Sequence, residues 1–171
     1  MKNLITFILS GAVLLGTVPL MAQSSDGYYN TNSTTPAMTA PSAGINWLTT
    51  YSEAVAQSQS TSKPIVILFT GTTWCPACMN LEREVIKKPE FAQLVGNKFI
   101  FLKAEMPGFS SEASPFKPLV ERYGINAYPS IVVVNANGQL LYRVNYRQGG
   151  PRAYADELLQ KLGQPDQGYY Q

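Results

Sequence analysis

The sequence contains no histidine and only two cysteines among its 171 residues. A tetrahedral zinc site needs four ligands, drawn largely from these two residue types, so the composition argues against a structural zinc centre. Charged residues make up 14% of the chain, with 13 basic and 11 acidic side chains and no run of lysine or arginine. A net charge of +2 is too balanced to indicate a nucleic-acid-binding surface. We therefore expect neither a metal nor a nucleic acid as partner, and nothing in the composition calls for a cofactor.

Charge is also missing from the beginning of the chain. No charged residue lies between Lys2 and Asp26, and residues 4–15 are mostly apolar. One basic residue, an apolar stretch and then Ala22 predict a secretory signal peptide over residues 1–22. The alternative is an uncleaved membrane anchor, because the uncharged stretch is long enough to span a bilayer. No cysteine lies near the cleavage point, which excludes lipidation of the usual bacterial lipoprotein kind.

Residues 23–44 are rich in serine, threonine, asparagine, alanine and proline and carry a single charge. Such a segment cannot bury a core, so we expect a flexible spacer. A folded domain is predicted over residues 45–163, followed by a disordered tail over residues 164–171.

The two cysteines lie close together in Trp74-Cys75-Pro76-Ala77-Cys78, directly after the apolar run 65–69. Proline suits the first turn of a helix, so the pattern predicts a strand, a short loop and then Cys75 at a helix N-terminus. The positive end of a helix stabilises a thiolate and lowers the pKa of a cysteine. A second thiol one turn later, that of Cys78, can resolve a mixed disulfide.

Three other interpretations of the pair are open. The cysteines could be small core residues, an inert disulfide closing a very short loop, or half of a metal site. A redox-active dithiol is favoured because the tryptophan and proline place the pair at a junction between loop and helix.

The rest of the chain predicts alternating strands and helices. Trp47, Tyr51 and Val55 recur at helical spacing and predict a leading helix, with Thr50 and Glu53 spaced as a capping box. The apolar and turn patterns after them predict strands at 65–70, 98–104, 131–134 and 139–146, and helices at 76–87, 89–95, 118–123 and 152–162. Asn137-Gly138 predicts a hairpin between the last two strands.

The Trp-Cys-x-x-Cys motif after an apolar strand, with Tyr128-Pro129-Ser130 entering a second apolar strand, resembles the thioredoxin superfamily. The likeness is to the exported, single-domain thioredoxin-like proteins of bacteria and covers roughly residues 45–162. It implies an α/β fold with a central mixed sheet of four to five strands flanked by helices.

The resemblance also implies roles for single residues. Cys75 would be the exposed nucleophile that attacks a substrate disulfide, and Cys78 would resolve the mixed disulfide. Pro129 would follow a cis peptide bond and lie opposite the cysteines, with the backbone of Tyr128 pairing with a bound peptide. Pro76 and Trp74 would border the same substrate site, the alternative for Trp74 being a plain core aromatic.

Two features depart from the family pattern. Many thioredoxins carry a buried aspartate on the strand before the motif, which helps to move the proton of the resolving thiol, but residues 69–73 contain no carboxylate. Glu105 and Lys103 are candidates to replace it, although solvent exposure of both is the favoured interpretation. The second departure is that Pro76 and Ala77 include no histidine, which strongly oxidising members often place between the cysteines.

The sequence thus predicts a periplasmic thiol–disulfide oxidoreductase, with a reductase favoured over an oxidase and an isomerase third. Its expected partners are exported proteins that contain disulfides and a membrane thiol donor, and we expect a monomer. One alternative is a copper-handling module that uses Cys75, Cys78 and Met79, because soft sulfur ligands suit Cu(I). Another is a non-catalytic interaction module that has kept the fold.

Overall fold

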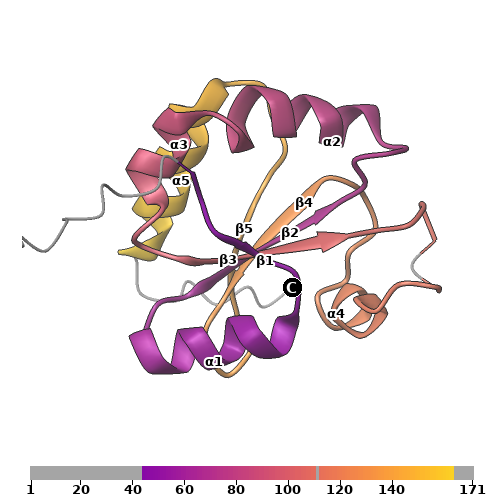
Figure 1. The fold of residues 1–171 in the computed structure, drawn as a ribbon, viewed down its shortest axis with the longest axis horizontal. Coiled ribbons are helices and arrows are strands. Elements are labelled where there is room, and N and C mark those ends of the chain that lie inside the picture. Colours follow the sequence, from indigo (N-terminus) through magenta and orange to yellow (C-terminus); the bar gives the residue numbers. More distant parts are fainter. Residues whose placement is uncertain (1–43, 111, 164–171) are drawn as a thin grey trace, which may run out of the picture. The chain divides into compact units, whose positions relative to one another are not determined.

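A five-stranded mixed sheet forms the centre of the computed structural model, which describes residues 44–110 and 112–163 (Figure 1). The strand order is β1-β3-β2-β4-β5, with β4 antiparallel to β2 and to β5 and the other pairs parallel. The strands are β1 (Trp47–Leu48), β2 (Ile65–Thr70), β3 (Ile100–Glu105), β4 (Ser130–Val134) and β5 (Leu140–Val144). The predicted mixed sheet flanked by helices is confirmed.

Helices cover both faces of this sheet (Figure 1). They are α1 (Tyr51–Thr61), α2 (Pro76–Leu81), the π turn η1 (Glu82–Ile86), α3 (Pro89–Val95), α4 (Lys117–Arg122) and α5 (Gly150–Leu162). Helices α1 and α4 share a buried cluster with one face, and α2, η1, α3 and α5 share another cluster with the opposite face. Within the described ranges, no helix is long and apolar enough to cross a membrane.

Strand β2 is the middle of the sheet and is buried along its whole length. Its side chains alternate between the two clusters, with Ile67 and Phe69 on one face and Val66 and Leu68 on the other. A strand covered on both faces is a continuous apolar run, which explains why residues 65–70 were recognisable from the sequence.

Most predicted elements are confirmed with bounds within two residues. Gly138, in the predicted hairpin, has a φ of +73°, a conformation that glycine adopts without strain. The helix predicted over residues 76–87 is continuous but widens into the π turn η1 in its second half, where Lys87 N donates to the carbonyl of Glu82 at 2.9 Å. The signal peptide, almost all of the spacer and the tail lie outside the described residues.

The leading helix begins later than its apolar spacing predicts. Trp47 and Leu48 form the edge strand β1, pairing with Phe101 and Leu102 of β3, and the Trp47 ring packs edge-on against Phe101 at 5.2 Å. Thr50 has extended backbone angles and makes no side-chain capping hydrogen bond, so the predicted capping box is wrong. Pairing with β3 outweighs the weaker helical preference of this segment.

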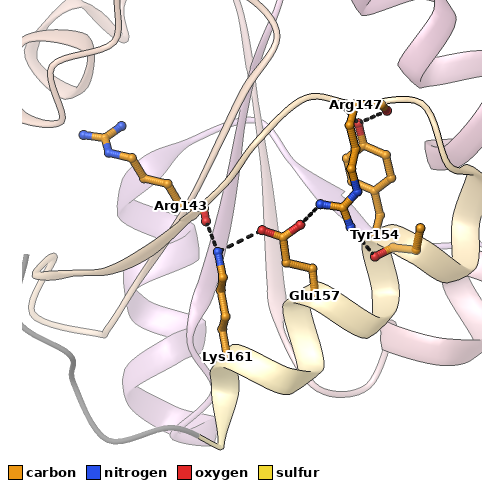
Figure 2. Close-up of polar contacts among 6 residues, drawn as sticks. Arg143, Arg147, Tyr154, Glu157 and Lys161 are labelled. Atoms are coloured by element: carbon orange, nitrogen blue, oxygen red, sulfur yellow. Dashed lines mark hydrogen bonds and ion pairs between the residues drawn. The ribbon is translucent and has the colours of Figure 1, made fainter.

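Helix α5 is held to β5 and the segment after it by a polar network (Figure 2). The carboxylate of Glu157 accepts hydrogen bonds from the guanidinium of Arg147 and from Lys161 Nζ, the latter at 2.8 Å. Lys161 also donates to the carbonyl of Arg143 at 2.8 Å, and the Tyr154 hydroxyl bonds both backbone groups of Arg147. Burial alone would raise the pKa of Glu157, but the bonds from Lys161 and Arg147 outweigh it and lower the pKa below its ordinary 4.5.

We expect Glu157→Gln to lower the free energy of unfolding by about 1 kcal/mol at neutral pH, the upper part of the range for partly exposed ion pairs. Because the folded-state pKa is lowered, this contribution is present above the ordinary carboxyl pKa and is lost as pH falls through the lowered value. Urea denaturation at neutral and at strongly acidic pH should therefore show a difference from wild type only at neutral pH.

The matched control is Glu90→Gln, because Glu90 faces Arg152 at 3.4 Å with both side chains about half or more exposed. It should change the stability little at either pH. An equal loss in both variants would contradict the role assigned to the Glu157 network.

Candidate active site

Three strand ends meet at one edge of the sheet. Thr70 of β2 pairs with Glu105 of β3, and Phe69 pairs with Ser130 at the beginning of β4. The backbone of Met106 donates to the carbonyl of Thr70 at 2.7 Å, which ties the loop after β3 to the end of β2. The cysteine motif, this loop and the Tyr128-Pro129 segment are thereby brought together.

Cys75 and Cys78 are joined by a disulfide, with their Cα atoms 5.2 Å apart. Cys75 is the N-cap of α2, and its Sγ accepts a hydrogen bond from the backbone N–H of Cys78 at 3.2 Å. Cys75 is 6% exposed and Cys78 1%. The expected exposure of Cys75 is therefore wrong for the disulfide-bonded protein, although Cys75 is the more exposed of the two residues.

The backbone of Tyr128 explains part of this burial, because its carbonyl oxygen lies 3.7 Å from Cys75 Sγ. The Tyr128-Pro129 bond is cis, as the resemblance implied. Pro129 is buried and Tyr128 is half-buried. Burial also raises the pKa of the Tyr128 phenol, so the ring beside the disulfide stays uncharged at neutral pH. Pro76 occupies the first turn of α2 and is exposed next to Cys75.

Trp74 lies beside this site and is half-buried against the core. Its indole N–H donates to the carbonyl of Met106 at 2.8 Å, and its ring meets that of Tyr128 edge-on at 5.5 Å. A Cβ at Gly71 would lie 2.3 Å from the indole, so only glycine allows this packing. Trp74 is thus more than a core aromatic, because it links the cysteine loop to the loop after β3.

Neither of the two candidates for a proton relay is free in solvent, contrary to the favoured expectation. Glu105 Oε1 accepts hydrogen bonds from the backbone N–H of Thr72 at 2.6 Å and from its hydroxyl at 2.8 Å. Lys103 Nζ lies 2.8 Å from a carboxylate oxygen of Glu82 and 5.4 Å from the centre of the Trp47 ring. Glu105 therefore positions the cysteine loop, and Lys103 is an ion-pair partner.

Glu82 is a residue that the sequence prediction missed. It is 9% exposed, and its Oε2 has no hydrogen-bond partner among the described residues. It follows Cys78 by one helical turn and its N–H donates to the Cys78 carbonyl, which places both residues on the buried side of the helix. It also begins the π turn η1, a helix form often found at functional sites. The available signal was an acidic residue four positions after a cysteine, on an apolar helical face.

Phe109 was also missed, because the sequence indicated only a loop over residues 106–114. Its ring packs edge-on against Trp74 at 6.3 Å and Tyr128 at 6.1 Å, yet its side chain is 72% exposed. No pattern in the sequence connects these three aromatic residues, which lie far apart along the chain.

The electrostatics of the site are modest. Arg83, on the same helical segment, donates to Asn80 at 2.9 Å and pairs with Glu84 at 3.0 Å, so its charge is engaged away from Cys75. The helix N-terminus is the main source of positive potential at the sulfur. Among the described residues, no group of three or more acidic or cysteine side chains could hold a metal ion.

Comparison with known proteins agrees with this geometry. A family model described as thioredoxin-like matches residues 46–136. The chain is 26% identical over 124 residues to the disulfide bond reductase DsbH of Chlamydia pneumoniae, covering 70% of this chain and 74% of that protein. It is 27% identical over 107 residues to the thioredoxin-related protein DsbJ of the same organism, covering 60% of this chain but only 31% of DsbJ. A solved structure of a DsbH oxidoreductase, 26% identical, superimposes with a TM-score of 0.62 over 80% of this chain and 94% of that one.

In the reduced protein we expect iodoacetamide to alkylate Cys75 at least about tenfold faster than Cys78 near neutral pH, the effect of roughly one unit of pKa. The cause is the helix N-terminus and the N–H of Cys78, which favour the Cys75 thiolate, together with the deeper burial of Cys78. Time-resolved peptide mass spectrometry gives both rates. Cys75→Ser serves as the control in which only slow labelling should remain, and equal rates at the two cysteines would contradict the assignment.

Proposed function

The chain belongs to the thioredoxin-like family, and from that premise we propose that it is an exported thiol–disulfide oxidoreductase that reduces protein disulfides. The observation that carries the proposal is the position of Cys75. Its sulfur caps a helix N-terminus, receives the N–H of Cys78 and lies against the Tyr128 carbonyl at an edge of the sheet. A thiolate there would be stabilised and could meet a substrate disulfide.

The reaction follows from the chemistry of the pair. The Cys75 thiolate attacks one sulfur of a substrate disulfide, forming a mixed disulfide and releasing the other substrate sulfur as a thiolate that takes up a proton. Cys78 loses its proton and attacks Cys75 Sγ, which releases the second substrate thiol. Two electrons pass to the substrate, and the protein is left with the Cys75–Cys78 disulfide seen in the structure.

Substrate binding is assigned to the residues around Cys75. We propose that the backbone of Tyr128, before Pro129, pairs with an extended substrate peptide, and that Trp74 and Pro76 border it. The short distance from Cys75 Sγ to the Tyr128 carbonyl supports this, because a peptide bound there would bring its own sulfur next to Cys75.

Glu82 is proposed as the proton acceptor for Cys78. The resolving thiol is 1% exposed and must lose a proton before it can attack. A carboxylate is available one helical turn away, with one oxygen paired to Lys103 and the other without a hydrogen-bond partner in the described part of the chain. The ion pair with Lys103 partly compensates the cost of keeping that charge buried.

A reductase is favoured because little in the site stabilises the thiolate strongly. The helix terminus contributes about 0.3–2 kcal/mol, the sequence has no histidine, and Arg83 is engaged elsewhere. A strong oxidant needs an unusually stable dithiol form. The relative DsbH is named a disulfide bond reductase, which supports the same direction.

The setting of the reaction is part of the proposal. We assign a signal peptide to residues 1–22, a spacer to residues 23–44 and the thioredoxin-like domain to residues 45–163, and we propose that the protein acts as a monomer in the periplasm. A reductase in an oxidising compartment needs a supply of electrons, so we infer a membrane thiol donor that keeps Cys75 and Cys78 reduced.

We expect a reduction potential nearer the value of about −270 mV for thioredoxin than the value of about −120 mV for the strong periplasmic oxidant. Equilibration of the Cys75/Cys78 pair with a reference thioredoxin measures it. The protein should also accelerate the reduction of insulin by dithiothreitol, and Cys75→Ser should not. A potential near the oxidant's value, with fast oxidation of reduced peptides, would show an oxidase instead.

We expect Glu82→Gln to slow resolution of the mixed disulfide by about tenfold or more. General base catalysis usually contributes about 100-fold or more, but the loss can be smaller here because water can partly replace the carboxylate as proton acceptor. Single-turnover quenching with a disulfide peptide separates this step from the attack by Cys75, whose alkylation rate should not change. Glu84→Gln is the matched control, since Glu84 is exposed on the same helical segment. Equal resolution rates in the two variants would remove Glu82 from the mechanism.

A further inference from the structure

Three aromatic rings form a continuous apolar surface beside the disulfide, which we call the aromatic wall: Trp74, Phe109 and Tyr128. Each ring meets the other two edge-on, at centre-to-centre distances of 5.5, 6.1 and 6.3 Å. The wall adjoins Cys75 directly, since Trp74 precedes it in the chain and the Tyr128 carbonyl lies 3.7 Å from its sulfur. Any peptide whose disulfide reaches Cys75 must therefore pass close to these rings.

Phe109 is the exposed member of the wall. At 72% exposure it stands out from the other large apolar side chains on the described surface, which are 37–42% exposed. Packing of the fold does not account for a phenylalanine so far out in solvent, because most of its apolar area remains in contact with water. A binding role does account for it, since that area is available to a ligand.

The base of the loop that carries Phe109 is firmly held. Met106, three residues earlier, donates its N–H to the Thr70 carbonyl at 2.7 Å and accepts the Trp74 indole N–H at 2.8 Å. Glu105 binds the backbone and the hydroxyl of Thr72. The ring is thus presented from a loop whose base is anchored to the cysteine motif, which lowers the entropy cost of ordering this loop when a substrate binds.

No charged residue adjoins the three rings in the sequence. Thr73, Gly108 and Ala127 directly precede them, and Cys75, Ser110 and Pro129 directly follow them. The acidic residues on either side of the loop are engaged: Glu105 with Thr72, and Glu112 with Lys117 at 2.7 Å. The surface therefore offers a partner apolar contact and ring edges rather than a charge to pair with.

We propose that Phe109 is a specificity residue that selects substrates with a large apolar or aromatic side chain two positions from the cysteine attacked by Cys75. This inference rests on the proposed function. An extended peptide that pairs with the Tyr128 backbone places side chains two residues apart on the same face. A further aromatic ring can then join the wall edge-on, an arrangement that stabilises aromatic pairs beyond their buried area.

A second copy of the chain fits this surface less well than a peptide. A standard interface buries about 800 Å² on each partner, whereas the wall consists of three side chains, of which Trp74 and Tyr128 are half-buried. A surface of that size suits one or two side chains of a substrate.

The test uses two disulfide-linked peptides that differ at one position, with phenylalanine or serine two residues from the cysteine. Wild-type protein should reduce the phenylalanine peptide with a kcat/KM about three- to tenfold higher, the range expected for one aromatic contact. Phe109→Ser should bring the two peptides to nearly equal kcat/KM, mainly by raising KM for the phenylalanine peptide, and Phe109→Leu should fall between. Leu140→Ser, which changes an exposed apolar residue of β5, is the control and should keep the wild-type ratio.

The inference would be overturned, with the proposed function intact, if wild type reduced both peptides equally or if Phe109→Ser kept the preference. A change in the Cys75 alkylation rate that matches the change in kcat/KM would also overturn it, because Phe109 would then act on the thiol rather than on the substrate. If wild type reduces neither the peptides nor oxidised glutathione, the proposed function fails, and this inference fails with it.

Discussion

The pairing of β2 with both β3 and β4 is the constraint on which the rest of the structure depends. Because β3 is parallel to β2 and β4 is antiparallel, the ends of two strands and the beginning of a third lie at one edge of the sheet. The cysteine motif follows β2, the loop with Phe109 follows β3, and Tyr128-Pro129 precedes β4. A shift in register of one residue would move every side chain of β2 to the opposite face of the sheet and separate these segments. The chemistry of the site is thus supported by the apolar contacts that fix the register.

A largely buried ion pair between Glu82 and Lys103 also connects the core of the protein with the cysteine site. Residues 69–73 contain no carboxylate, and Phe69 is completely buried in the apolar cluster that β2 shares with α1 and α4. The carboxylate that pairs with Lys103 comes from η1, where Glu82 lies 2.8 Å from the lysine Nζ. The Trp47 ring packs over the same lysine. The short edge strand β1 therefore does more than extend the sheet, because it places the ring that packs over this ion pair. A buried carboxylate is costly without such a partner, so Lys103 is what allows Glu82 to lie close to the resolving cysteine.

The site combines a sulfur that is mostly covered with an aromatic surface that is open. Cys75 is 6% exposed in the disulfide form, whereas the adjoining Phe109 is 72% exposed. A disulfide in a compact substrate could reach the sulfur only through a flexible or extended segment. This arrangement fits the proposed action on other proteins' disulfides, in which the peptide contacts would set the selectivity and the pair of thiols the reactivity.

The sequence by itself determined most of the elements and the cysteine pair. Strand β2 was recognisable because a strand buried on both faces is a continuous apolar run, and Cys75 and Cys78 were recognisable because their spacing and Pro76 are local features. The cis bond before Pro129 was predicted correctly, but from the family resemblance and not from local propensity. Only the tertiary structure decided that Trp47 lies in a strand, that Glu82 is buried opposite Lys103, and that Phe109 meets Trp74 and Tyr128. Each of these depends on contacts between segments distant in the chain, and such contacts are set by the strand register and by packing, which no local pattern of residues encodes.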